Sequence, residues 1–89
     1  MTPGRRQAEV EALGMTIQAE RTALGLTLDG LAARTGIHRN TIHDYEKAKK
    51  EVPFGKLVDI AEGLNLTTLQ LLRLAEERGE RRPGTRDSA

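Results

Sequence analysis

The segment from Thr27 to Lys47 constrains the fold most, because it encodes two short amphipathic helices joined at a glycine. Thr27 is a good N-cap for the first helix, and Asp29 lies in its first turn, where the helix dipole stabilises a negative charge. Gly36 permits the left-handed backbone conformation that a tight turn between two helices requires. The second helix then extends from about Arg39 to Lys47. These features predict a helix, a tight turn and a second helix.

Three further helices are predicted on either side of this pair. Apolar residues at helical spacing indicate a first helix over about 7–24, although Gly14 is a position at which it can break. A fourth helix is predicted over about 55–64, and a fifth begins at a capping box in residues 67–70 and ends near Arg78. The side chains that we expect the fourth helix to bury are Leu57, Val58, Ile60, Ala61 and Leu64.

The chain of 89 residues is long enough for one domain with a single core. We predict an all-α fold, in which residues 13–78 form a compact five-helix domain. Residues 1–12 are expected to be an N-terminal arm or an extension of the first helix. Residues 79–89 are charged and contain Gly, Pro and Ser, a composition that predicts a disordered tail.

Composition argues against several classes of function. Without cysteine, the chain can form no disulfide, no thiolate metal site and no cysteine nucleophile. His38 and His43 lie about 140° apart around a helix and have no ligand partners at suitable spacing, so we expect no metal and no cofactor. No arrangement of catalytic residues is evident, which argues against an enzyme. No apolar run reaches the roughly 18–20 residues of a membrane span and no apolar signal segment follows the first arginines, so we expect a cytoplasmic, nucleoid-associated protein.

Four side chains of the helix after Gly36 match the hydrogen-bonding groups on base edges in the major groove of DNA. Arg39 can donate two hydrogen bonds to guanine, and Asn40 can form two with adenine. His43 can donate or accept, and Asp44 can accept from cytosine. The alternative is an ordinary solvated helix face, since such residues are common on any surface. The grouping of all four beside the turn favours DNA binding.

Three lysines, Lys47, Lys49 and Lys50, follow this helix at the point where a DNA backbone would pass. We expect them to contact phosphates, although a solvated loop would have a similar composition. The net charge of the chain is only +1, so total charge alone does not indicate a nucleic-acid partner. Arg5 and Arg6 could form an arm that reaches around a duplex, but a basic terminus is often simply solvated.

The predicted fifth helix contains more leucine than one helix can bury against a small core. Some of these side chains should therefore be exposed in a monomer, and an exposed apolar stripe commonly marks a partner surface. We predict a twofold dimer contact through this helix. The leucines concerned are Leu66, Leu69, Leu71, Leu72 and Leu74, of which Leu66, Leu69 and Leu72 are the predicted interface.

The order and spacing of motifs along residues 13–72 resemble the lambda-repressor-like family of helix-turn-helix proteins, also known as the Cro/C1 or XRE family. The motifs are Leu-Gly-x-x-Ile at 13–17, Arg21, Leu24-Gly25-Leu26-Thr27, Leu31-Ala32, Gly36-Ile37, Asn40-Thr41-Ile42 and Tyr45-Glu46. They continue with Pro53, Leu57, Ile60-Ala61, Leu64 and Leu71-Leu72.

This resemblance implies a five-helix fold whose third helix enters the major groove, usually as a homodimer on a pseudo-palindromic operator. It implies base contacts by Arg39, Asn40, His43 and Asp44, in agreement with their chemistry. It also implies an inter-helix salt bridge between Arg21 and Glu46. The phosphate contacts that it implies are those of Thr27, Thr41, Lys47, Lys49 and Lys50.

Three positions depart from the family pattern. Leu28 stands where the family often has a glutamine that contacts the DNA backbone, and leucine cannot form that hydrogen bond. Ala48 replaces the glycine that usually follows the third helix. His38 stands at the cap position before that helix, where serine or threonine is common.

We therefore predict a sequence-specific DNA-binding transcription regulator, a repressor or a Cro-like switch protein, that acts as a homodimer. One alternative is an antitoxin that binds its own promoter while residues 79–89 fold onto a protein partner. Another is a protein-interaction module without DNA binding, which Leu28 and the low net charge would suit.

Overall fold

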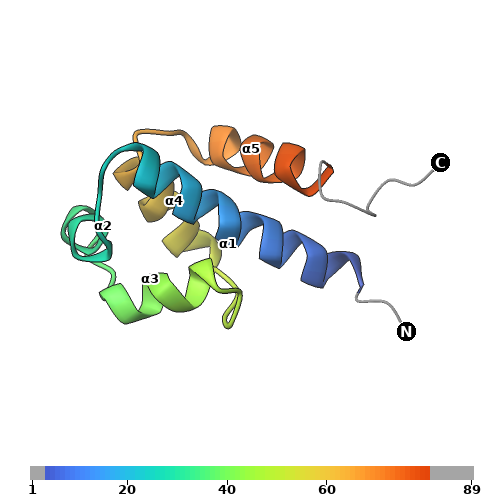
Figure 1. The fold of residues 1–89 in the computed structure, drawn as a ribbon, viewed down its shortest axis with the longest axis horizontal. Helices are drawn as coiled ribbons and strands as arrows, with labels where there is room; N and C mark the ends of the chain where they lie inside the picture. Colours follow the sequence, from blue (N-terminus) through green and yellow to red (C-terminus); the bar gives the residue numbers. More distant parts are fainter. Residues whose placement is uncertain (1–3, 81–89) are drawn as a thin grey trace.

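The computed structural model describes residues 4–80, and within this range it contains five helices and no strand (Figure 1). The all-α, five-helix prediction is confirmed. Helix α1 lies between α5 and α3, α2 packs on α3 and α4, and α4 packs on α5. No helix in the described part of the chain is both long and apolar enough to cross a membrane. The helices are α1 (Arg5–Ala23), α2 (Leu28–Thr35), α3 (Arg39–Glu46), α4 (Phe54–Gly63) and α5 (Thr68–Glu80).

Each helix contributes a fully enclosed aliphatic side chain to one core. These residues, one from each helix in chain order, are Ile17, Leu31, Ile42, Ile60 and Leu71. Burial of such a side chain contributes about 1.5–3 kcal/mol, so this core provides most of the favourable free energy of folding. Because Ile42 and Tyr45 anchor α3 in the core, the opposite face of α3 points away from the protein.

Side chains cap three of the helices at their N-termini. Thr27 Oγ1 accepts a hydrogen bond of 2.9 Å from the amide of Gly30 at the start of α2. His38 Nδ1 accepts one of 3.0 Å from the amide of Asn40, so histidine takes the place of serine or threonine at the start of α3. Thr67 and Gln70 form the reciprocal capping box at the start of α5. The backbone ends of α2 and α3 are therefore well defined.

The expectation that Gly14 could interrupt the first helix is wrong, because α1 is continuous from Arg5 to Ala23. The glycine is needed where α1 crosses the end of α3. A Cβ atom at this position would lie 2.5 Å from the carbonyl oxygen of Tyr45 and 2.7 Å from that of Glu46. Glycine therefore permits a close approach of two backbones, at the cost of a weaker helix propensity.

Two other expectations differ from the structure. Val58 is 39% exposed and does not belong to the buried face of α4, whose core side chains are Leu57, Ile60 and Ala61. Helix α5 continues through Gly79 and Glu80, the first two residues of the predicted tail. Residues 81–89, the rest of that tail, lie outside the described residues, as do residues 1–3.

The connection between α3 and α4 turns at Ala48, whose φ angle of 59° lies in the left-handed region. This conformation allows the Ala48 amide to bond the Tyr45 carbonyl and the Lys49 amide to bond the Asp44 carbonyl, at 3.1 and 2.8 Å. The left-handed conformation costs an alanine roughly 1–2 kcal/mol. The turn therefore stores strain at the position where the resemblance to the Cro/C1 family implies a glycine.

Replacement of Ala48 by glycine is expected to raise the free energy of unfolding by about 0.5–1 kcal/mol. The relief of left-handed strain exceeds the entropy that glycine adds to the unfolded chain. Urea denaturation of the two proteins measures the change. Asn65→Gly is the matched control, because Asn65 also has a left-handed φ of 64° but asparagine tolerates this region. An equal gain in both variants would contradict the proposed strain at Ala48.

Candidate nucleic-acid interface

The turn between α2 and α3 fixes the direction of α3. Gly36 ends α2 with a φ of 76°, and its amide bonds the carbonyl of Ala32 at 2.8 Å. Ile37 then enters the core, and His38 caps α3. Because both sides of the turn are anchored, α3 is held in one orientation relative to α2.

The outer face of α3 brings together the four side chains predicted to contact bases. Arg39 and Asn40 are exposed, whereas His43 and Asp44 are half-buried. Their spacing along the helix places them in one stripe. None of the four belongs to the core. The stripe offers a guanidinium, an amide, an imidazole and a carboxylate, which are groups that can form hydrogen bonds with base edges.

The residues predicted to contact phosphates flank this stripe in sequence. Lys47, Lys49 and Lys50 are exposed in the connection after α3. Thr27 is exposed, and its hydroxyl accepts from the Gly30 amide, so it can still donate its own proton. Thr41 is half-buried in the first turn of α3.

An ion pair between α1 and α3 lies behind the stripe. Arg21 Nε donates to Glu46 Oε2 at 2.7 Å, and Nη2 donates to Oε1 at 3.1 Å. The third donor, Nη1, bonds the backbone carbonyl of Leu26 at 2.9 Å. The side chains of Arg21 and Glu46 are only 11% and 1% exposed, and the hydrogen bond to Glu46 raises the pKa of Arg21. This pair holds Glu46, the last residue of α3, against α1.

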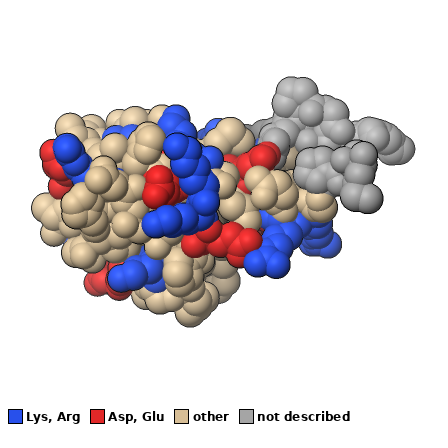
Figure 2. Space-filling model, turned by 90° about the horizontal axis from the view of Figure 1, so that it is seen from below, with Lys and Arg blue, Asp and Glu red and all other residues tan. Residues whose placement is uncertain are grey.

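Three cations on this side of the molecule are paired with carboxylates, which sequence reasoning missed. Arg39 Nη1 lies 3.4 Å from Asp29 Oδ2, and Lys50 Nζ lies 3.6 Å from Asp44 Oδ2. Arg6 binds both carboxylate oxygens of Glu51, at 2.7 and 2.9 Å. Figure 2 shows this face, on which positive and negative groups lie next to one another rather than in separate patches.

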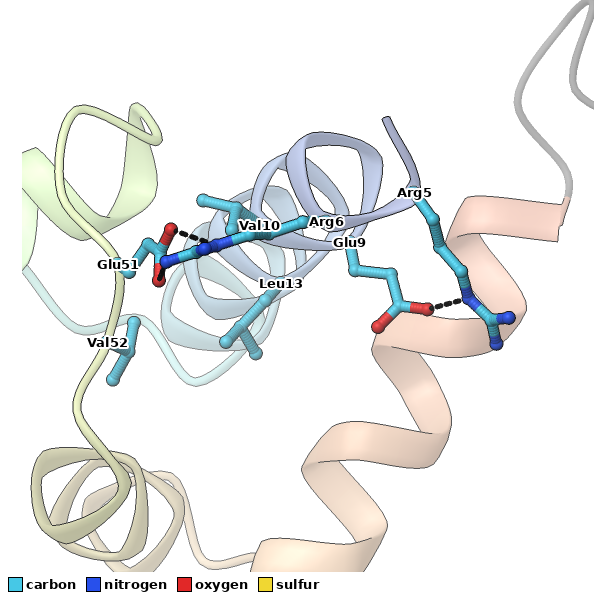
Figure 3. Close-up of a pocket in the computed structure, with 7 residues that line it drawn as sticks. All are labelled: Arg5, Arg6, Glu9, Val10, Leu13, Glu51 and Val52. Carbon is cyan, nitrogen blue, oxygen red and sulfur yellow. Dashed lines mark hydrogen bonds and ion pairs between the residues drawn. The ribbon is translucent and has the colours of Figure 1, made fainter. Parts of the chain in front are cut away.

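The pair between Arg6 and Glu51 lies at a shallow pocket between the start of α1 and the connection to α4 (Figure 3). The hydrogen bond from Arg6 lowers the pKa of the Glu51 carboxyl. Its contribution to stability is therefore present above the ordinary pKa of a glutamate and is lost as the pH falls through the lowered value. Among the described residues, no cluster of His, Asp or Glu could hold a metal ion. The pocket is lined by Arg5, Arg6, Glu9, Val10, Leu13, Glu51 and Val52.

The leucines of the predicted dimer surface differ in exposure. Leu69 is 71% exposed and Leu72 is 37% exposed, whereas Leu66 is partly buried against the core. Leu71, between them, is fully buried. Helix α5 therefore has an outward apolar side that no other described element covers.

The model of a helix-turn-helix family matches residues 17–72, which include α2, α3 and α4 completely. The chain belongs to the helix-turn-helix family of the Cro/C1 (XRE) type. It is a DNA-binding transcription regulator, as the sequence predicted. The matched residues include the capped helix α2, the turn at Gly36 and the helix α3.

Two solved structures are similar to this helix-turn-helix regulator. The first is the clp gene regulator ClgR from C. glutamicum, with a TM-score of 0.72 and 26% identity over 78% of this chain and 90% of that chain. The second is the restriction-modification controller protein C.AhdI from Aeromonas hydrophila, with a TM-score of 0.69 and 25% identity over 72% of this chain and 97% of that chain. A comparison with curated proteins gave no match.

Proposed function

We propose that this helix-turn-helix regulator is a repressor or Cro-like switch protein that reads its operator with the outer face of α3. Arg39 and Asn40 carry most of the base recognition, and His43 and Asp44 add to it. The observation that supports this assignment most is the orientation of α3. Its inner side chains are fixed in the core and in the ion pair to Arg21, while the four polar side chains share its outer face.

Phosphate contacts set the register of α3 in the groove in this proposal. The lysines after α3 hold one side of the groove, and Thr27 and Thr41 hold the other through their hydroxyl groups. The residue after Thr27 is Leu28, whose side chain offers no hydrogen bond, so the side chains of this region make fewer contacts to the DNA backbone than the family pattern implies. The phosphate-contacting set is Thr27, Thr41, Lys47, Lys49 and Lys50.

The active species is proposed to be a homodimer on a pseudo-palindromic operator in the cytoplasm. Leu66, Leu69 and Leu72 form its interface, which is supported by the outward apolar side of α5. Twofold symmetry then places two copies of α3 in successive major grooves, about 34–36 Å apart.

Replacement of Leu69 by glutamate is expected to convert this dimer into a monomer, because the charge would be buried at the interface without a partner. Light scattering coupled to gel filtration measures the mass of each species. Phe54→Glu is the matched control, since Phe54 is 70% exposed, close to the 71% of Leu69, but lies at the start of α4. A wild-type monomer at all accessible concentrations, or a dimer unaffected by Leu69→Glu, would contradict the interface.

The base-reading assignment is tested with an operator selected from a random DNA pool. Arg39→Ala is expected to weaken binding about 5- to 150-fold and to relax the preference at one base pair, since it removes one bidentate contact. Lys50→Ala is expected to weaken binding to all sequences alike and to reduce the salt slope by about one.

Fluorescence anisotropy with the selected operator and a scrambled duplex measures both effects. If Arg39→Ala lowered the affinity for the operator and for the scrambled duplex equally, the proposed role of Arg39 in base recognition would be contradicted. Binding of the wild-type protein should also fall by orders of magnitude between about 50 and 200 mM salt. Binding that ignores salt would favour a protein-interaction module instead.

A further inference from the structure

Three cations on the side of the molecule that carries α3 are paired with carboxylates in this structure. Arg39 is paired with Asp29 of α2, and Lys50 is paired with Asp44 of α3. Arg6 of α1 is paired with Glu51, which belongs to the same connection as the lysines. Each pair joins two different elements, so the three carboxylates are brought to the cations by the fold itself.

The pairs of Arg39 and Arg6 are exposed, and in the third pair the side chain of Lys50 is 59% exposed but that of Asp44 only 30%. The side chains of Asp29 and Arg39 are 73% and 58% exposed, and those of Glu51 and Arg6 are 54% and 81% exposed. Exposed ion pairs are individually weak and exchange with other ions. A phosphate group can therefore replace each carboxylate, but it must compete with it.

We propose that Asp29, Asp44 and Glu51 form an electrostatic screen that lowers the affinity of this surface for phosphate, whatever the DNA sequence. This inference rests on the proposed role of α3 in reading DNA. A phosphate contact by Lys50 or Arg6, or by Arg39 in a complex where it reads no base, requires the loss of an existing ion pair. Each displaced carboxylate also remains close enough to repel the phosphate.

The screen has its largest effect on the affinity for random DNA. Binding to random DNA depends on phosphate contacts almost entirely, whereas a cognate complex adds base contacts by Arg39 and Asn40. The same reduction in phosphate affinity therefore releases the protein from random DNA while the cognate complex persists. The alternation of charges in Figure 2 and the net charge of +1 agree with such a surface.

The experiment compares two triple variants that change the net charge equally. The screen variant is Asp29→Asn, Asp44→Asn and Glu51→Gln. The control variant is Glu62→Gln, Glu76→Gln and Glu77→Gln, at exposed positions on α4 and α5. Helix α5 lies on the opposite side of α1 from α3 (Figure 1). Circular dichroism verifies that both variants fold.

Two measurements are made on each protein at about 100 mM salt, where charges more than about 10 Å apart are largely screened. The first is the affinity for a random-sequence duplex, and the second is the salt concentration needed for elution from heparin. The screen variant is expected to bind the random duplex about 8- to 125-fold more tightly, at about two- to fivefold for each of the three carboxylates. The control variant is expected to change less than about twofold.

A further variant isolates one pair. Arg6→Gln combined with Glu51→Gln removes both partners, so it should bind the random duplex as the wild-type protein does, while Glu51→Gln alone binds more tightly. Equal gains in the screen and control triple variants would overturn the proposal, because net charge rather than pairing would then be responsible. An absence of gain in the screen variant would overturn it as well.

The outcomes separate this inference from the proposed function. If the wild-type protein selects an operator but the screen variant gains affinity for neither the random duplex nor heparin, the proposed screen alone is overturned. If the wild-type protein selects no sequence but the screen variant binds heparin more tightly, the proposed base reading by α3 is overturned. The screen then remains as a feature that lowers affinity for polyanions in general.

Discussion

Glu46→Ala is expected to lower the free energy of unfolding by about 3 kcal/mol. The substitution leaves the Arg21 guanidinium, whose side chain is 11% exposed, without the carboxylate that binds two of its nitrogens. Removal of one partner of a buried ion pair typically costs about 3–5 kcal/mol, and the lower end applies because Arg21 retains some contact with water and its bond to the Leu26 carbonyl.

Denaturation in urea measures this loss, and an Arg21→Met, Glu46→Leu double variant provides the comparison. The double variant should recover much of the stability, because no buried charge is then left unpaired. The single variant should also bind an operator more weakly, since the end of α3 is no longer held against α1. If the single and double variants were equally unstable, packing around Glu46 rather than charge would be responsible.

Gly14→Ala is expected to lower the free energy of unfolding by about 2 kcal/mol, although alanine normally stabilises a helix. The new methyl group would lie within 2.7 Å of two backbone oxygens at the end of α3, and backbone cannot move aside cheaply. Overpacking of this kind costs about 1–3 kcal/mol or more, against a gain of up to about 1 kcal/mol in helix propensity.

Gly55→Ala is the matched control for that experiment. Gly55 lies in the first turn of α4, and a Cβ atom there would meet nothing within 4 Å. Its replacement is therefore expected to raise the free energy of unfolding by about 0.5 kcal/mol. Stabilisation by both substitutions would show that α1 and α3 can separate at no cost.

The helices were predictable because their signals are local. Thr27, Gly36 and the capping box at Thr67 and Gln70 define helix ends through contacts within a few residues. The inward direction of Ile42 and Tyr45 follows from helical periodicity, and it leaves the opposite face of α3 outward. The fold and the candidate site therefore followed from short-range patterns.

The features that were missed depend on how helices cross. A glycine inside a helix does not reveal that another backbone touches it, so the role of Gly14 required the structure. The partners Arg39 and Asp29 are ten residues apart, and Arg6 and Glu51 are forty-five apart, beyond the spacing of local helix pairs. The exposure of Val58, by contrast, follows from helical periodicity, because it lies about 100° around α4 from Leu57 and outside the stripe of Leu57, Ile60 and Ala61.

Helix α1 packs between α5 and the segment that carries α3 and the lysines. Its last turns are held to Glu46 by the nearly buried ion pair of Arg21, whereas the exposed pair of Arg6 and Glu51 at its first turn adds little. In a dimer formed through α5, the distance between the two copies of α3 is thus fixed by α1, which packs against both α3 and α5. An operator lengthened by one base pair, about 3.4 Å, cannot be accommodated by bending within the protein, so binding should be intolerant of altered half-site spacing.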